Sequence, residues 1–185
     1  MNRKKLPIGI QTFAKIREDN HYYVDKTPLI MKLINDGTHY FLSRPRRFGK
    51  SLLIDTIGEL FAGNEPLFTG LYSHDKWDWS VKYPVIRISF GGGVVHDVEH
   101  LKRRIFTILE NNCHRLAIDF ERLNDVSDVF EALILKLVEK TGQRVVILVD
   151  EYDKPILDNL LKPEIAKEIR DELRNLYSVI KDSDA

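Results

Sequence analysis

Short apolar runs and longer amphipathic stretches alternate along this chain. The compact apolar runs lie at residues 39–42, 85–90 and 144–149, and runs of this length and composition are typical of buried strands. The last run contains Val145–Val149, an unbroken apolar series rich in β-branched side chains, as in strands covered on both faces of a parallel sheet. We therefore predict a strand at each of the runs.

Between the runs, apolar residues recur at the spacing of a helix face. Pro28 suits a first helical turn, Gly37 and Gly142 suit helix ends, and Asp97 suits a helix cap. Strands that alternate with helices indicate an α/β fold with a mostly parallel sheet. We see no segment with the composition of a linker between two domains. Residues 9–23 are expected to be turn-rich. The predicted helices cover residues 27–36 (with Leu29, Ile30, Leu33 and Ile34 inward), 51–61, 97–116, 127–140 and 164–180.

The composition is that of an ordinary globular domain, with 43% hydrophobic and 30% charged residues in a chain of 185. Its 28 basic residues balance its 28 acidic ones, so direct nucleic-acid binding is not expected from this chain. Cys113 is the only cysteine, which excludes an internal disulfide and a four-cysteine zinc site. No apolar run approaches the roughly 20 residues of a membrane helix, so we expect no membrane partner and a cytoplasmic location.

Candidate chemistry first appears in the window 44–51, between a predicted strand and a predicted helix. The phosphate-loop pattern G-x-x-x-x-G-K-S/T matches at Gly49, Lys50 and Ser51, while Arg44 replaces the first glycine. Gly49 lets the backbone approach a phosphate, Lys50 reaches its oxygens, and the Ser51 hydroxyl suits Mg²⁺. The predicted nucleotide-binding residues are Arg46, Arg47, Phe48, Gly49, Lys50, Ser51 and Leu52.

Two alternatives stay open for this window. Gly-Lys-Ser can open a helix by chance, because a match of so few residues is a weak signal. Arg46 and Arg47 either contact nucleotide phosphates or a neighbouring subunit, or are solvated loop residues. We interpret Trp77 and Trp79 as core or lid packing rather than as a base-stacking site.

A second candidate site follows the strand predicted at 144–149. Asp150 and Glu151 end this apolar run, as expected of a Walker B strand. Asp150 would support the Mg²⁺ shell, and Glu151, together with Lys50, is the predicted catalytic residue, with Glu151 as the base for an attacking water. The alternative is that the acids merely mark a strand end. Since ligands of open α/β sheets bind beyond the carboxyl ends of the strands, we expect Ser51 and Asp150 to face one crevice.

These residues resemble the bacterial and archaeal AAA-ATPase-like proteins, whose larger members often carry a C-terminal domain of the PD-(D/E)XK nuclease superfamily. The string from Arg44 to Ser51 is specific to that family and makes Arg44 a family feature. The block Tyr23–Thr27 looks like the family's N-terminal signature and, by analogy, is expected near the nucleotide base. The blocks that carry the resemblance are Phe13–Glu18, Tyr23–Thr27, Phe41–Leu52, Tyr83–Ile86 and Leu148–Pro155.

The resemblance implies a P-loop NTPase three-layer sandwich that uses ATP and Mg²⁺. It divides residues 1–185 into a signature segment, 1–37, and a nucleotide-binding core, 38–185. A strand with a polar sensor residue is expected where the chain stops, so the resemblance makes this an N-terminal part of the domain, incomplete at its C-terminus. We then expect exposed sheet edges, lower stability, self-association and poor ATP turnover.

The function expected from these observations is ATP binding with Mg²⁺-dependent hydrolysis. A nucleotide-binding switch or scaffold without turnover is the first alternative. A module of a nucleic-acid-associated defence or mobile-element protein is the second, and a salt-dependent DNA shift would favour it. The sequence leaves open the choice between ATP and GTP, the protein partner and the oligomeric state.

Overall fold

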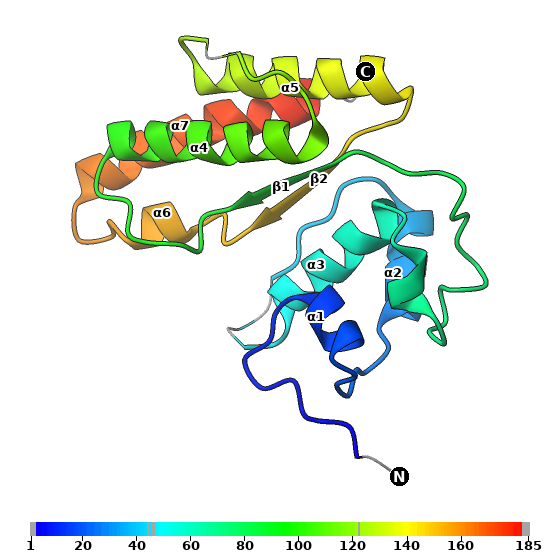
Figure 1. Ribbon diagram of the computed structural model, residues 1–185. Helices are drawn as coiled ribbons and strands as arrows, with labels where there is room; N and C mark the ends of the chain where they lie inside the picture. The colour runs from blue at the N-terminus through cyan, green and yellow to red at the C-terminus, as the bar shows by residue number, and fades with distance from the viewer. Residues whose placement is uncertain (1–2, 44, 46, 122, 183–185) are drawn as a thin grey trace. The chain divides into compact units, whose positions relative to one another are not determined.

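The computed structural model describes residues 3–43, 45, 47–121 and 123–182. The chain divides into two compact units, Met1–Val85 and Ile86–Ala185, and each is described by itself. Helices and a small parallel sheet make the fold α/β (Figure 1). Within the described residues, no helix has the length and apolar character needed to cross a membrane.

The sheet consists of β1 (Val85–Ser89) and β2 (Val146–Asp150), which lie side by side and point the same way in Figure 1. The Phe90 amide donates to the Asp150 carbonyl at 3.3 Å, so the pairing continues to the end of both strands. Ile86, Ile88 and Phe90 alternate along the chain and are all buried in one core. Both strands were predicted from their apolar runs, and both are confirmed.

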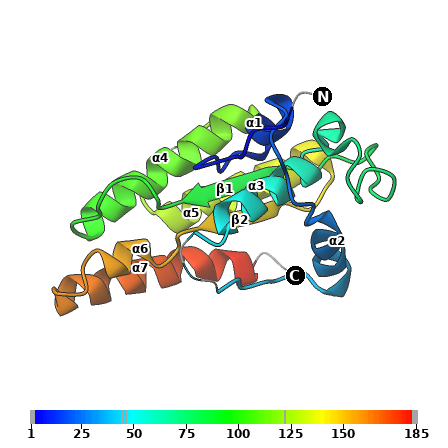
Figure 2. The same ribbon diagram turned by 90° about the horizontal axis from the view of Figure 1, so that it is seen from below.

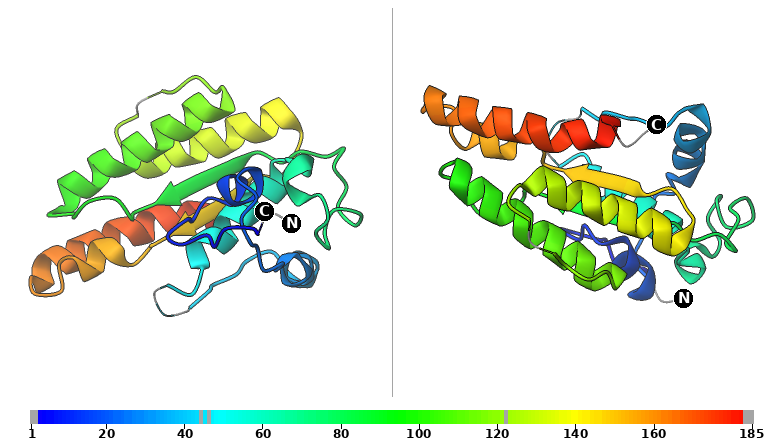
Figure 3. Two further views of the ribbon diagram at one scale, coloured as in Figure 1. Left: turned by 60° about the horizontal axis from the view of Figure 1, so that its bottom comes forward. Right: turned by 90° about the horizontal axis from the view of Figure 1, so that it is seen from above.

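Helices α4 (Val98–Leu116), α5 (Val126–Thr141) and α7 (Pro163–Asp182) contact one another on one side of these strands (Figures 1 and 2). The short α6 (Lys154–Leu157) leads from β2 into α7, which the two views in Figure 3 also show. This arrangement gives one helical layer on the sheet of this unit. The α/β class is therefore shown, whereas the three-layer sandwich stays a prediction. The helical core residues are Leu101, Ile105, Leu109, Val129, Phe130, Leu133, Leu137, Ile169, Leu173 and Leu176.

Side-chain caps explain where α4 and α5 begin. The Asp97 carboxylate accepts a hydrogen bond from the His100 amide at 2.7 Å, which confirms the predicted cap. Asp125 accepts from the Ser127 amide at 2.8 Å, so α5 starts one residue before the predicted 127. Gly142 follows α5 with a left-handed φ of 64°, the conformation in which glycine ends helices most readily.

A buried asparagine closes the edge of β1 that faces away from β2. The Asn112 side chain accepts from the Arg87 amide at 2.9 Å and donates to the Arg87 carbonyl at 2.8 Å. Its carboxamide thus bonds one strand residue as a neighbouring strand would. Asn112 is only 4% exposed and also donates to the Ile108 carbonyl, so it holds α4 against the sheet.

In the first unit, α1 (Phe13–Glu18), α2 (Thr27–Asp36), α3 (Lys50–Phe61) and the 3-10 turn η1 (Glu65–Phe68) surround a small aromatic core. The Phe13 ring lies 4.9 Å from that of Phe68, and Phe68 lies 5.2 Å from Trp79. Trp77 packs edge-on against Phe61 at 5.2 Å. The interpretation of both tryptophans as packing residues is confirmed.

Helix α1 lies inside the segment predicted to be turn-rich. Its Phe13 amide donates to the Asp55 carboxylate of α3 at 2.6 Å, and Arg17 donates to the Leu67 carbonyl at 2.7 Å. These partners are distant in sequence, and a six-residue helix is too short to show a clear periodicity. Helix α2 begins and ends as predicted, but Leu29, expected inward, is 67% exposed.

The strand predicted at residues 39–42 is wrong. No strand is assigned to these described residues, and Tyr40 and Leu42 are 49% and 41% exposed. The Tyr40 hydroxyl donates to the Leu33 carbonyl, which ties the segment back to α2.

Asn112→Ala should lower the free energy of unfolding by roughly 1–3 kcal/mol, because the Arg87 amide and carbonyl lose the buried partner described above. Urea unfolding followed by circular dichroism measures the change. Asn111→Ala, an exposed change on the same helix, is the control and should stay within about 0.5 kcal/mol of the parent. Equal effects of the two changes would contradict the role of Asn112 at the strand edge.

Candidate functional site

Two described residues of the loop before α3 have a left-handed backbone. Arg47 has a φ of 67°, and Gly49 is left-handed with φ 75° and ψ 26°. Lys50 then begins α3, and the Leu53 amide closes the first turn on the Gly49 carbonyl at 3.0 Å. A left-handed residue followed by a right-handed one turns successive amides toward a common concavity, which favours an anion.

The start of α3 lacks the side-chain cap that Asp97 and Asp125 give to α4 and α5. Its N-cap residue is Gly49, which has no side chain, and no cap hydrogen bond is found at this start among the described residues. Lys50 and Ser51 are both partly buried in this first turn. Neither the Lys50 ammonium nor the Ser51 hydroxyl makes a hydrogen bond or ion pair with a described residue. Within the described residues, the Lys50 ammonium and the Ser51 hydroxyl in this turn are therefore available to a ligand.

The remaining loop residues have different environments. Phe48 is 58% exposed, and Arg47 is exposed as well. Leu52 packs against the aromatic core of its unit, and its carbonyl accepts from the Thr56 hydroxyl at 2.8 Å. Leu52 therefore anchors the helix under the loop through its side chain. Arg46, also predicted to bind nucleotide, lies outside the described residues, as does Arg44.

The two acids follow β2 as the sequence predicts. Asp150 is the last residue of the strand, and its carboxylate accepts from the Glu151 amide at 3.0 Å. Glu151 is exposed and has a φ of 52°, in the left-handed region that non-glycine residues rarely adopt. Backbone strain of this kind persists only where the surrounding structure enforces it, and it is concentrated at functional sites.

Gly91 makes room for the Glu151 carboxylate. A Cβ atom placed on Gly91 would lie 3.3 Å from both Cδ and Oε2 of Glu151. Gly91 follows the last residues of β1, so the carboxylate lies over the ends of both strands. The next residues are held by basic groups: Arg104 lies against Gly92, and the Lys154 ammonium donates to the Gly93 carbonyl at 2.6 Å.

A buried tyrosine lies close to the same acidic turn. Burial raises the pKa of Tyr177 far above its usual value, and Tyr152 and Asp153 raise this pKa further. Its hydroxyl has no hydrogen-bond partner among the described residues. Tyr177 is therefore neutral at every physiological pH and contributes packing, with a dipole but no charge, beside the turn.

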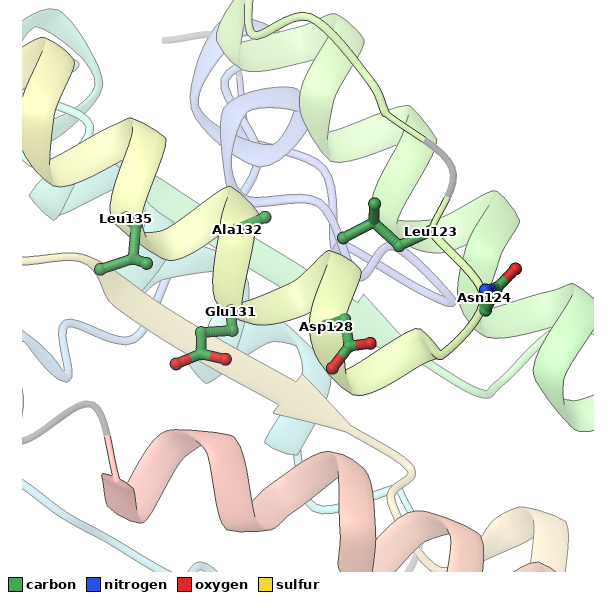
Figure 4. A pocket seen from close by; sticks show the side chains of 6 residues that line it. All are labelled: Leu123, Asn124, Asp128, Glu131, Ala132 and Leu135. Carbon is green, nitrogen blue, oxygen red and sulfur yellow. The ribbon is translucent and has the colours of Figure 1, made fainter.

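Phosphate-loop residues and acidic residues belong to different units of the chain, and the geometry above holds within each unit. Among the described residues, no group of three or more His, Cys, Asp or Glu side chains could hold a metal ion by itself. A surface pocket on α5 involves none of the predicted site residues (Figure 4). Its lining includes Asp128 and Glu131, whose charge disfavours phosphates; the other lining residues are Leu123, Asn124, Ala132 and Leu135.

Comparison with known proteins identifies the family. The AAA-ATPase-like family, described as "Predicted AAA-ATPase", matches residues 7–185. A protein of Azotobacter chroococcum mcd 1, described as an uncharacterized protein in the vnfD 5′ region, is 64% identical over 186 residues. The alignment covers 100% of this chain and 36% of that relative, so the chain spans little more than a third of the relative's length. No solved structure matches the chain.

The strain at Glu151 gives a test that does not depend on any ligand. Glu151→Gly should be more stable than Glu151→Ala by roughly 1 kcal/mol, because only glycine adopts this φ without steric cost. Urea unfolding of the two variants measures the difference. At an ordinary loop position the order is reversed, since glycine increases the entropy of the unfolded chain. An alanine variant as stable as the glycine variant would argue against the left-handed backbone.

Proposed function

The chain belongs to the AAA-ATPase-like family, and from this premise we propose that the loop before α3 binds the phosphates of ATP. The observation that carries the proposal is the uncapped first turn of α3, which follows a left-handed Gly49. The partial positive charge of a helix N-terminus favours an anion there. The residues at this turn, Gly49-Lys50-Ser51, are those that a phosphate loop requires.

Each residue of this turn has a separate role in the proposal. Gly49 has no side chain to keep a phosphate from the amides, and Lys50 supplies a positive charge whose ammonium is not committed to a described residue. The Ser51 hydroxyl fits a hard cation such as Mg²⁺, which prefers oxygen ligands and retains several waters and phosphate oxygens. Bound Mg²⁺ would neutralise part of the triphosphate charge.

The acids after β2 complete the proposed site. Asp150 supports the shell of Mg²⁺, and Glu151 takes the proton from the attacking water. Two features support a catalytic place for Glu151: its left-handed backbone, and the space that Gly91 leaves for its carboxylate. The proposal requires the loop of one unit and the acids of the other to meet at one nucleotide. Both the hydrolysis of ATP and its dependence on Mg²⁺ are part of this proposal.

Lys50→Ala should weaken ATP binding by roughly 10- to 100-fold, the loss expected when a charge-assisted hydrogen bond to phosphate is removed. Isothermal titration calorimetry with ATP and Mg²⁺ measures it. Lys32→Ala removes the same charge from an exposed position on α2 and is the matched control. Binding that is unchanged in Lys50→Ala would refute the phosphate-loop assignment. A parallel titration with GTP tests the base preference.

Glu151→Gln should retain ATP binding and lose hydrolysis, because the amide cannot accept the proton of water. Asp150→Asn should instead reduce the effect of Mg²⁺ on ATP affinity. Phosphate release and calorimetry with and without Mg²⁺ separate the two outcomes. Turnover by Glu151→Gln at the parent rate would eliminate Glu151 as the base. Nucleotide binding without turnover by the parent would instead support a switch or scaffold.

A further inference from the structure

A second lysine, Lys26, lies at the phosphate loop. A Cβ atom placed on Gly49 would be 3.6 Å from the Lys26 ammonium nitrogen. Apart from the chain neighbours of Gly49, this nitrogen is the one atom of a described residue within 4 Å of that position. Lys26 is separated from Gly49 by α2 and the segment after it, so the spacing of these residues along the chain does not show this approach.

The residues around Lys26 fix its backbone firmly. The Asp25 carboxylate accepts from the Thr27 amide at 2.8 Å and, with its other oxygen, from the Tyr72 amide at 2.8 Å. The Thr27 hydroxyl donates to Asp25 at 2.7 Å and accepts from the Ser73 amide at 3.1 Å. Thr27 and Ser73 are fully buried. Lys26 thus extends from a clamp that joins α2 to the segment after η1.

Lys26 lies where an anion would be a favourable partner for its charge. The residue is partly buried, and its ammonium makes no hydrogen bond or ion pair with a described residue. It lies at the N-terminal end of α3, where the helix dipole repels a cation. Lys50, a second cation without such a partner, begins the same helix. A bound anion between these groups would turn repulsion into attraction.

We propose that Lys26 is a second phosphate-binding residue, and that it grips the polyphosphate of a nucleoside triphosphate together with Lys50. This inference rests on the proposed function of the loop. A lysine ammonium is a compact positive charge that only donates hydrogen bonds, so its charge favours the anionic phosphate oxygens over a neutral base. The signature block Tyr23–Thr27 therefore serves the phosphate end of the ligand rather than the base.

Lys26→Gln should weaken the binding of ATP, and of inorganic tripolyphosphate as its competitor, by roughly 10-fold or more. Lys26→Arg keeps the charge and should recover most of the affinity. Lys32→Gln, the same change at an exposed position of α2, should leave both affinities unchanged. Calorimetry measures the affinities, and melting temperatures show whether each variant is folded.

A second experiment uses the unaltered chain, so its result does not depend on whether the variants fold. Acetylation of lysines, read by mass spectrometry, should be slowed at Lys26 and Lys50 by tripolyphosphate, while Lys32 reacts at its usual rate. Lys26 that reacts equally fast with and without tripolyphosphate, in a sample where Lys50 is protected, overturns the inference.

The outcomes separate this inference from the function on which it rests. Parent-like binding by Lys26→Gln, with binding lost in Lys50→Ala, removes Lys26 and leaves the phosphate loop in place. Weaker ATP binding with unchanged tripolyphosphate binding also refutes it, because Lys26 would then contact the sugar or base. A parent chain that binds neither ATP nor tripolyphosphate refutes the proposed function and this inference together.

Discussion

The first amides of an α-helix carry partial positive charge and need acceptors, and this requirement organises much of the molecule. Aspartates supply the acceptor at several helix starts: Asp97 on α4, Asp125 on α5, and Asp55 for the first amide of α1. Helix α3 begins at a glycine, a lysine and a serine, and the described residues give it no side-chain cap. This contrast with α4 and α5 supports the proposed function, because a phosphate would provide the missing acceptor.

The first unit is built so that this open helix start stays in place. Leu52 and Leu60 fasten α3 to the aromatic core, while Asp55 reaches from α3 to the backbone of α1. Asp25 and Thr27 join α2 to the segment around Tyr72. Burial raises the pKa of the Tyr23 hydroxyl, which also hydrogen-bonds Thr56 of α3, so this part of the signature block remains neutral and packed. A rigid support of this kind keeps the donors pre-arranged, which lowers the entropic cost of binding.

Sequence patterns predicted the elements whose signals are local. The apolar runs gave β1 and β2, and Asp97, Gly37 and Gly142 marked helix boundaries correctly because caps act within a few residues. The run at 39–42 misled because a short apolar run does not by itself distinguish a strand from another apolar segment. Helix α1 was missed because its support comes from residues far along the chain. The approach of Lys26 to Gly49 and the turn at Glu151 depend on tertiary structure, so no local pattern indicates them.

Two positions that are far apart in the sequence, 151 and 91, determine where the Glu151 carboxylate lies at the ends of the strands. Glu151 has a left-handed backbone, which costs free energy in an L-residue, of order 1 kcal/mol. A glycine would remove that cost but would also remove the carboxylate. Gly91 lies opposite this carboxylate. The Cβ atom of any other residue at position 91 would lie 3.3 Å from Cδ and Oε2 of Glu151. The two residues act on the same carboxylate: the left-handed backbone of Glu151 places it over the ends of the strands, and Gly91 leaves that space unfilled. Structural needs alone would favour a glycine in the turn, so an acid at this strained position supports the catalytic role proposed for Glu151.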